Sequence, residues 1–303
     1  MLLRAKKKPK SLHICNGIQM KLMLVPFLVL FLLVTVVPVL VSMGLSLFEY
    51  DPMKGAKWNG LDNYIYMFFE DDVFWTSVKN TLLFALVTGP IGFMLSFVLA
   101  WFINEFSPFT RSILSFLFYS PALMGNAYFI WQVIFSSDSY GYMNSFLLSL
   151  GLINSPIQWL KEPAYILPII MIVQLWMSMG VSFLANIAGL QNVNEELYEA
   201  GAIDGIKNRW YELWYITLPY MKNILLFSAV MQISSSFSAG QICMTLAGFP
   251  SVNYAAETIV THLTDVGTMR YEMGLACAIS FFLFLIMLAS RWIIGKILAK
   301  VGK

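Results

Sequence analysis

The chain has 303 residues, of which 58% are hydrophobic and only 12% are charged, and its formal net charge is +2. A soluble domain carries about 25% charged residues, so this composition excludes an ordinary soluble protein and predicts one that resides in a lipid bilayer. The chain lacks the alternating apolar and polar segments of a membrane β-barrel, and helices are therefore expected to cross the membrane.

Six uncharged runs are long enough to cross a bilayer, for which about 20 apolar residues suffice. They are residues 22–48, 80–104, 112–137, 163–194, 223–256 and 273–290. The fourth and fifth runs exceed one span, so parts of each are expected to form loops or interfacial structure. We therefore predict an all-α integral membrane protein with six transmembrane helices.

Lys and Arg residues are distributed unevenly over the segments between these runs. With the N-terminus inside, the inner segments hold fourteen of the 19 and the outer segments hold five. This excess obeys the positive-inside rule and predicts that both termini are cytoplasmic. The predicted parts are a basic cytoplasmic tail (1–21), a first transmembrane helix (22–48), an outer loop (49–79), a core of five transmembrane helices (80–297) and a cytoplasmic tail (298–303).

Several local features refine this plan in chain order. The basic tail is expected to be held electrostatically at the anionic inner leaflet. The apolar run that follows is too long for a signal peptide and no A-x-A site ends it, so an uncleaved helix is expected. Asn80 and Thr81 are predicted to open the second span. The outer stretch 141–152 has its own apolar periodicity, which favours a helix lying on the surface.

The cysteines and histidines carry no recognisable site. Cys15, Cys243 and Cys277 show no metal-binding spacing, so we expect neither a disulfide framework nor a metal site. His13 and His262 are isolated, and we interpret them as ordinary surface or loop residues.

The segment 189–222, between the fourth and fifth spans, is polar but carries the signals of ordered helices. Asn194 is a good N-cap, and acidic residues follow it in the first turn, where the helix dipole favours them. Gly205 suits the left-handed conformation that ends helices, and Asn208 can cap a second helix. Pro219 is predicted to lie in the first turn of the fifth span.

The first helix of this segment is about nine residues long, too short to be stable alone in water. It is therefore expected to dock on a partner. Ala200, Gly201 and Ala202 add little bulk, so the walls of another protein can close around the helix. Glu195, Glu199 and Asp204 can then meet basic residues of that partner.

This segment resembles the EAA loop of permease subunits of bacterial ABC importers, whose pattern is E-A-A, three residues, Gly, then I-x-L-P. The matching residues are Glu199, Ala200, Gly205, Ile216, Leu218 and Pro219. Gly201 replaces the second alanine, and one additional residue precedes Ile216, which is expected to rotate the second helix by about a third of a turn. In this family the loop is a cytoplasmic helix-turn-helix coupling loop that inserts into a cleft of the ATPase.

The resemblance extends over most of the chain, which is similar to maltose-type and glycerol-phosphate-type sugar permeases. The resembling residues are Gly60-Leu61-Asp62-Asn63-Tyr64, Phe74-Trp75, Asn80-Thr81, Trp131 with Phe135, Gly141, Asn144, and Met273-Gly274 with Ala276. It implies the type I ABC importer permease fold in the bacterial cell membrane, and the first permease of a heterodimer. The implied partners are a second permease, a cytoplasmic ATPase dimer that carries ATP and Mg²⁺, an extracytoplasmic substrate-binding protein, and a sugar; no nucleic acid is expected.

The chain has no G-x-x-x-x-G-K-[ST] phosphate loop. We therefore expect that it is not an enzyme and binds no cofactor itself, and that ATP hydrolysis belongs to the separate ATPase subunit.

Polar and aromatic residues inside the spans are candidates for the substrate pathway. None of the six runs contains a charged residue, which disfavours a proton-coupled carrier and favours a neutral substrate. The candidates are Asn126, Trp131, Gln132, Gln174, Trp176, Ser178, Gln232, Ser235, Ser236 and Gln241. Amides hydrogen-bond sugar hydroxyls and aromatic rings cover the C–H face of a pyranose. For each single residue, hydrogen bonding between helices is the alternative interpretation.

Two other functions stay open at this point. One is a motor-independent secondary carrier, which the uncharged spans disfavour. The other is a non-transporting membrane scaffold or sensor whose polar loop recruits a signalling partner. The loop could also lie on the membrane with its tryptophans at the interface.

Overall fold

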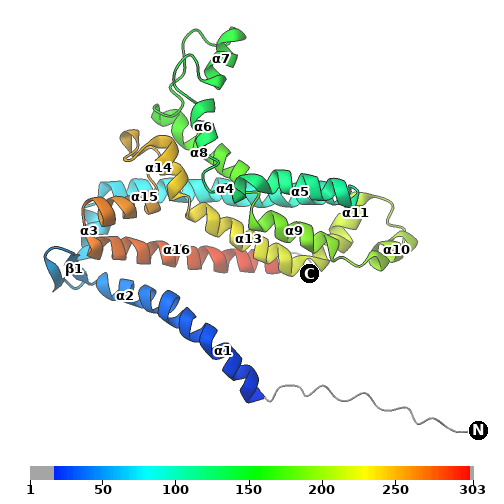
Figure 1. Cartoon of the computed structure of the whole chain (residues 1–303), viewed down its shortest axis with the longest axis horizontal. Helices are drawn as coiled ribbons and strands as arrows, with labels where there is room; N and C mark the ends of the chain where they lie inside the picture. Colours follow the sequence, from blue (N-terminus) through cyan, green and yellow to red (C-terminus); the bar gives the residue numbers. More distant parts are fainter. Residues whose placement is uncertain (1–16, 301–303) are drawn as a thin grey trace, which may run out of the picture.

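The computed structural model describes residues 17–300 of the chain, and their side chains over residues 22–297. Figure 1 shows long helices arranged side by side along the longest axis of the molecule. The helices are α1 (Gly17–Phe31), α2 (Val37–Leu45), α3 (Asp62–Phe69), α4 (Asp72–Asn104), α5 (Pro108–Leu123), α6 (Phe129–Ile134), α7 (Tyr142–Ser149), α8 (Pro163–Met177), α9 (Val181–Gln191), α10 (Glu195–Ile203), α11 (Arg209–Glu212), α12 (Leu218–Tyr220), α13 (Lys222–Phe237), α14 (Gly240–Ala247), α15 (Ile259–Thr264) and α16 (Met273–Lys300). The predicted basic tail (1–21), His13 and Cys15 lie wholly or largely outside the described residues, as do residues 301–303 of the predicted tail 298–303.

Among the described residues, four helical stretches are long and apolar enough to cross a bilayer. They are Leu22–Leu45, Asp72–Asn104, Pro163–Gln191 and Met273–Ile297. A fifth follows if Arg209–Tyr220 and Lys222–Phe237, which are bent by 82° at their junction, count as one span. The helical membrane class is thus confirmed, whereas six spans are not found. The predicted third run is divided into α5 and α6 by turns over residues 124–128, which follow Pro121 and include Gly125.

The second predicted span begins earlier than expected. Helix α4 starts at Asp72, and the Asp71 carboxylate caps it by accepting a hydrogen bond from the backbone N–H of Phe74 at 3.0 Å. Placing the start at Asn80 was therefore wrong, because Asp71 is the stronger cap. Asn80 and Thr81 instead lie inside α4 and hold the loop over residues 254–259. The Asn80 amide donates to three carbonyls over residues 254–257, and the Thr81 hydroxyl accepts from the N–H of Ile259.

One end of the molecule carries the strands that an all-α prediction misses. Strands β1 (Phe48–Asp51) and β2 (Gly55–Trp58) form an antiparallel hairpin in which Phe48 pairs with Trp58. The hairpin packs on the start of α16, where a side chain at Gly274 would collide with the Phe48 carbonyl. Helix α7 confirms that the outer stretch 141–152 contains a helix of its own.

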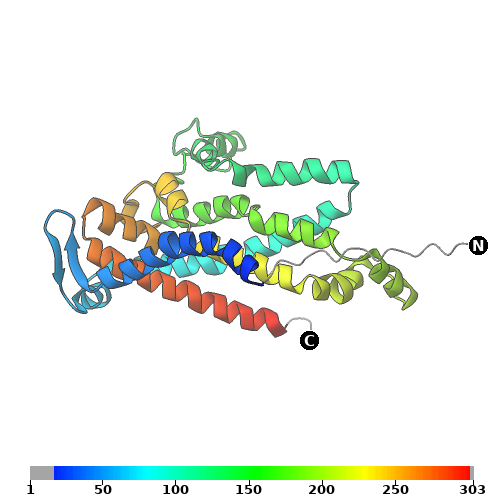
Figure 2. The ribbon, with the colours of Figure 1, turned by 60° about the horizontal axis from the view of Figure 1, so that its bottom comes forward.

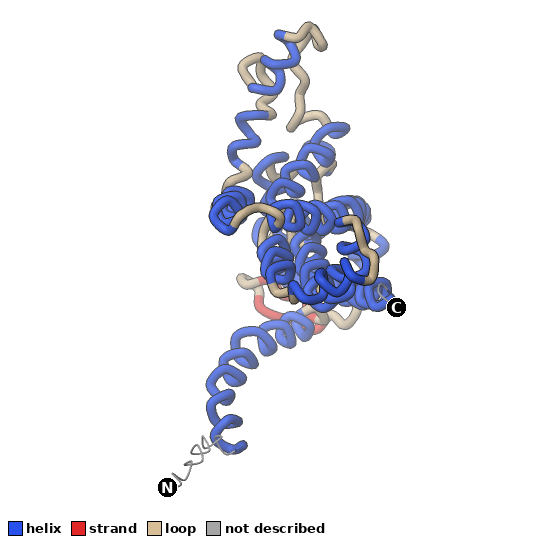
Figure 3. Tube along the Cα trace, turned by 90° about the vertical axis from the view of Figure 1, so that its right-hand side faces the viewer, coloured by secondary structure: helices blue, strands red, loops and turns tan. Residues whose placement is uncertain are grey.

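Helices α4, α9 and α13 form the centre of the bundle. Their interface buries Phe97, Phe183 and Leu225 almost completely. The first span is different, because no residue in its most apolar 18-residue stretch is buried against the rest of the chain. Figure 3 shows α1 leading away from the other helices, and Figure 2 shows α5 at the edge of the bundle.

Three interruptions separate helices that follow one another in the chain. They lie between α5 and α6 (124–128), between α8 and α9 (178–180), and between α13 and α14 (238–239). The fourth and fifth apolar runs, predicted to be too long for one uninterrupted span, contain the last two of these breaks. Irregular backbone at membrane depth is tolerated where it is buried in protein or lines a cavity, so these breaks direct attention to the space between them.

Candidate functional site

The polar segment between α9 and α13 folds as its sequence predicts at three positions. Asn194 caps α10 by accepting from the N–H of Glu196 at 3.2 Å, and Asn208 caps α11 by accepting from the N–H of Trp210 at 3.1 Å. Gly205, between the two helices, has a φ of 93°, a left-handed value that glycine adopts readily. In Figure 1 this segment lies at the opposite end of the molecule from β1 and α3.

Gly201 was expected to leave space for a partner protein, but it faces other residues of its own loop. It is buried, and a Cβ built on it would lie 2.7 Å from Cδ1 of Ile216 and 3.3 Å from Cδ1 of Ile206. The space beside Gly201 is therefore filled by the loop itself. Ala200 and Ala202, which flank it, are exposed.

The additional residue before Ile216 does not require the second helix of the segment to rotate, as the sequence predicted. Residues Leu213–Thr217 form a π-helical turn, in which the N–H of Leu218 bonds to the carbonyl of Leu213. A π-turn takes up one residue more than an α-turn, so it accommodates the additional residue within the helix. The hydroxyls of Tyr198 and Thr217, 2.9 Å apart, then tie this helix to α10.

Pro219 lies before, and not within, the helix that it was predicted to start. It sits in α12, and α13 begins at Lys222 after the 82° bend. Met221 at the bend is completely buried, so the bend is anchored in the bundle.

The exposed surface of α10 is acidic. The carboxylates of Glu195, Glu199 and Asp204 form no ion pair within the part of the chain that the structure describes. Nearby, Arg209 pairs with Glu212 at 2.7 Å and with Glu105 at 2.9 Å, which links α11 to the turn between α4 and α5. A cavity of about 660 Å³ lies between that turn and α10, and Glu195 and Glu199 line it.

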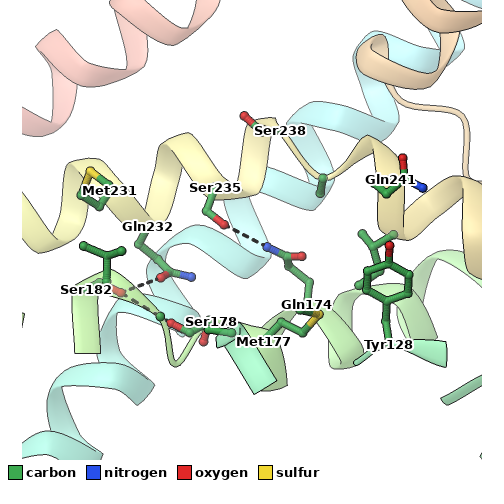
Figure 4. A pocket seen from close by; sticks show the side chains of 15 residues that line it. Tyr128, Gln174, Met177, Ser178, Ser182, Met231, Gln232, Ser235, Ser238 and Gln241 are labelled. Atoms are coloured by element: carbon green, nitrogen blue, oxygen red, sulfur yellow. Dashed lines mark hydrogen bonds between the residues drawn. The ribbon is translucent and has the colours of Figure 1, made fainter. Parts of the chain in front are cut away.

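A second cavity, of about 370 Å³, lies where the three helix breaks meet (Figure 4). Five of the candidate pathway residues line it: Gln174, Ser178, Gln232, Ser235 and Gln241. Two hydrogen bonds between helices hold this set. The Gln174 amide donates to the Ser235 hydroxyl at 3.3 Å, and the Ser182 hydroxyl donates to the Gln232 carbonyl oxygen at 3.0 Å.

The remaining candidates lie outside this cavity and bind other parts of the protein. Trp131 stacks on Phe135 and meets Trp176 edge to face. Asn126 accepts a hydrogen bond from the Tyr128 hydroxyl, and the Gln132 amide donates one to the Thr245 carbonyl. The Ser236 hydroxyl accepts from Thr88 and donates to the Gln232 backbone carbonyl.

Sequence reasoning missed Tyr128, Ser182, Ser238 and two methionines, Met177 and Met231, which also line the cavity. Tyr128, Ser182 and Ser238 lie at or within two residues of a helix break. Gly180 and the Ser238-Ala239-Gly240 stretch could have indicated the breaks.

His262 is not the loop histidine that the sequence predicts. It is 1% exposed, and its Nε2 lies 2.8 Å from Oδ2 of Asp71. Burial raises the pKa of the Asp71 carboxyl, but the hydrogen bond and charge of His262 and backbone N–H groups outweigh it and hold this pKa below its ordinary value. At nearby Glu257, burial raises the pKa. Cys243 and Cys277 are free, and no group of His, Cys, Asp or Glu suited to a metal occurs among the described residues.

Comparisons with known proteins extend these observations. No family model matches the chain. It is 34% identical over 215 residues to the probable ABC transporter permease protein YesP of Bacillus subtilis (strain 168), covering 70% of this chain and 68% of that protein. It is 29% identical over 265 residues to the arabinooligosaccharides transport system permease protein AraP of the same organism, covering 87% and 83%.

Two crystal structures of bacterial alginate ABC transporters share the fold. Each matches with a TM-score of 0.77 over 94% of this chain, and the chains matched are covered to 96% and 95%. The identities are 24% and 23%. One of these transporters imports the acidic polysaccharide alginate, and the other structure contains a periplasmic protein with a bound alginate pentasaccharide.

Proposed function

Because this chain belongs to the family of ABC importer permeases for sugars, we propose that it forms half of the translocation pathway for a sugar or oligosaccharide. As a permease subunit it is not the enzyme of the importer, since ATP hydrolysis belongs to a separate subunit. The proposed complex contains a second permease, a cytoplasmic ATPase dimer with ATP and Mg²⁺, and an extracytoplasmic substrate-binding protein. The complex resides in the bacterial cell membrane, with both termini of this chain in the cytoplasm.

The main support for the proposal is that the α10–α12 segment connects two helices that both line the cavity. Helix α9 leads into the segment and α13 leads out of it, and both contribute side chains to the cavity of about 370 Å³. The Tyr198–Thr217 hydrogen bond and the contact of Gly201 with Ile216 tie the two arms of the segment together. A partner that displaces α10 therefore moves both walls.

The exposed carboxylates support an ATPase as that partner. Glu195 and Glu199 lie on α10, which is too short to be stable without support, and Asp204 follows its last residue. The three carboxylates offer negative charge to basic residues. We propose that Glu199, Ala200, Gly201, Asp204, Gly205, Ile216, Leu218 and Pro219 form the coupling loop. ATP binding and hydrolysis then bias a two-state equilibrium between an outward-open and an inward-open pathway.

The two alternative functions have weaker support. A secondary carrier driven by protons needs acidic or basic groups in the pathway, and none of the residues that line the cavity is Asp, Glu, His, Lys or Arg. A non-transporting scaffold does not require a cavity at the place where three helix breaks meet. Neither alternative accounts for the kinship with permease proteins.

The test is ATP-dependent uptake of a labelled oligosaccharide by proteoliposomes that contain the whole complex. Glu199→Lys reverses a coupling charge, and Gly205→Pro cannot adopt the φ of 93°. Both are expected to abolish uptake while the chain inserts and assembles normally. Glu162→Lys, an equivalent reversal of an exposed carboxylate at the start of α8, is the matched control and should leave uptake unchanged. Normal uptake by both loop variants refutes the coupling role.

A further inference from the structure

The second arm of the α10–α12 segment, Arg209–Tyr220, lies across the direction of the membrane spans. It is bent by 82° from α13, and Figure 1 shows it running across the longest axis of the molecule, along which the long helices lie. Met221 at the bend is completely buried, so the arm is held against the bundle at the start of α13. A helix that is perpendicular to a span and held at its end lies along the membrane surface.

This arm has one face on the protein and one face that is exposed. Leu213 and Thr217 are buried against the bundle. On the other face, four side chains are between 56% and 64% exposed, and each is an aromatic ring that carries a polar N–H or O–H. These four form the aromatic face of the arm: Trp210, Tyr211, Trp214 and Tyr215.

Rings of this kind suit the boundary between lipid acyl chains and headgroups. Trp and Tyr are enriched there because the ring is apolar while its N–H or O–H bonds to headgroups and water. The N–H and O–H groups of the aromatic face form no hydrogen bond with any described residue, so they are available for such bonds. Phe, Leu and Ile, which suit the acyl chains themselves, are absent from this face.

Trp101 shows at which depth the arm lies. It is in the last turn of α4, near the end of the apolar span Asp72–Asn104, and its ring centroid is 5.1 Å from that of Trp210. Beside this contact, Arg209 at the start of α11 pairs with Glu105, which follows the last residue of α4. The rings thus lie where α4 leaves the hydrocarbon, and the charges lie just outside it.

Helix α16 carries a second mark of the same boundary. Trp292 is 63% exposed, and Nζ of Lys296, one turn further along the helix, lies 3.5 Å from the centre of its ring. Figures 1 and 2 place this end of α16 level with the start of α13 along the longest axis, and α10 farther out. Trp and Lys are typical anchors at the end of a span. Two separate helices therefore place the membrane surface at the level of the second arm.

We propose that the aromatic face of the second arm lies in the lipid–water interface of the membrane, on the cytoplasmic side in the proposed orientation. The segment then divides its contacts, because α10 projects beyond the membrane surface with its carboxylates while the second arm rests on lipid. This placement needs only the helical membrane class of the chain. It goes beyond the proposed coupling role and does not depend on it.

The test is photocrosslinking of the complete permease–ATPase complex in phospholipid nanodiscs. One residue at a time is replaced by the photoreactive amino acid benzoylphenylalanine, which substitutes one aromatic ring for another in Trp214→benzoylphenylalanine and Tyr215→benzoylphenylalanine. After illumination, mass spectrometry of each variant should find this chain joined to phospholipid. Ile203, 87% exposed at the end of α10, is the control position, and Ile203→benzoylphenylalanine should give no lipid adduct.

Each other outcome decides against the inference. Adducts with the ATPase or the second permease at positions 214 and 215 mean that protein covers the aromatic face. No adduct at either position means that the face meets water, and equal lipid adducts at position 203 mean that the whole segment lies on the membrane. The two ring positions are tested separately, so damage by one replacement does not decide the result. The proposed coupling role has its own readout, an ATPase adduct at position 203, and its absence counts against that role alone.

Discussion

The contact between Gly201 and Ile216 offers a sharp test of how the two arms of the α10–α12 segment act together. A Cβ at position 201 would lie 2.7 Å from the Cδ1 methyl of Ile216, closer than carbon atoms approach. That methyl is the flexible end of its side chain, so Gly201→Ala requires only a small shift. It also restores the second alanine of the family pattern, and we expect transport close to normal. Gly201→Leu cannot be accommodated in this way.

The magnitude follows from the packing. Forcing additional methylene groups into a filled contact costs about 2 kcal/mol, which changes the docking equilibrium of α10 on the π-helical turn roughly 30-fold. Because α10 has only nine residues, it does not hold its position without this contact. Gly201→Leu is therefore expected to reduce ATP-driven uptake at least about tenfold while ATP hydrolysis by the complex persists.

The assay measures uptake and ATP hydrolysis in the same proteoliposomes, with the amount of assembled complex as a check. Ala164→Leu adds three of the same four carbon atoms at an exposed position at the start of α8 and should couple normally. Ile216→Ala in the Gly201→Leu background removes the opposing methyl groups and should recover part of the uptake. Unchanged coupling in Gly201→Leu, or equal loss in Ala164→Leu, contradicts the reasoning.

Three further predictions concern stability. Asn144 is completely buried and makes five hydrogen bonds with residues 136, 138, 157 and 159. Asn144→Ala should therefore lower the free energy of unfolding by about 3 kcal/mol, measured by denaturant titration, and a loss under about 1 kcal/mol contradicts this. Burial raises the pKa of Glu257 above its ordinary 4.5, so the folded state holds this proton more tightly and stability falls as pH rises above that value. Glu257→Gln should therefore raise Tm at neutral pH and flatten its decline with pH; an unchanged pH profile opposes this account. The Arg209–Glu105 ion pair is 61% and 42% exposed, and a double-mutant cycle should find a coupling below about 1 kcal/mol.

The sequence alone determined the features that depend on neighbours within a few residues. Asn194 and Asn208 cap helices through the N–H groups of residues two positions later, and Gly205 adopts its left-handed φ because it has no side chain. Composition alone likewise indicated a helical membrane protein, since apolar runs of this length are stable only in lipid. The residues around Glu199 also carried the resemblance to importer permeases that the comparisons bear out.

The tertiary structure decided what depends on residues far apart in the chain. His262 is buried because Asp71, 191 residues away, lies beside it, and nothing local predicts this pair. Leu213–Thr217 accommodates the additional residue as a π-turn, where local spacing predicted a rotated helix. The cavity gathers Tyr128, Ser182 and Gln232 from three separate helical paths.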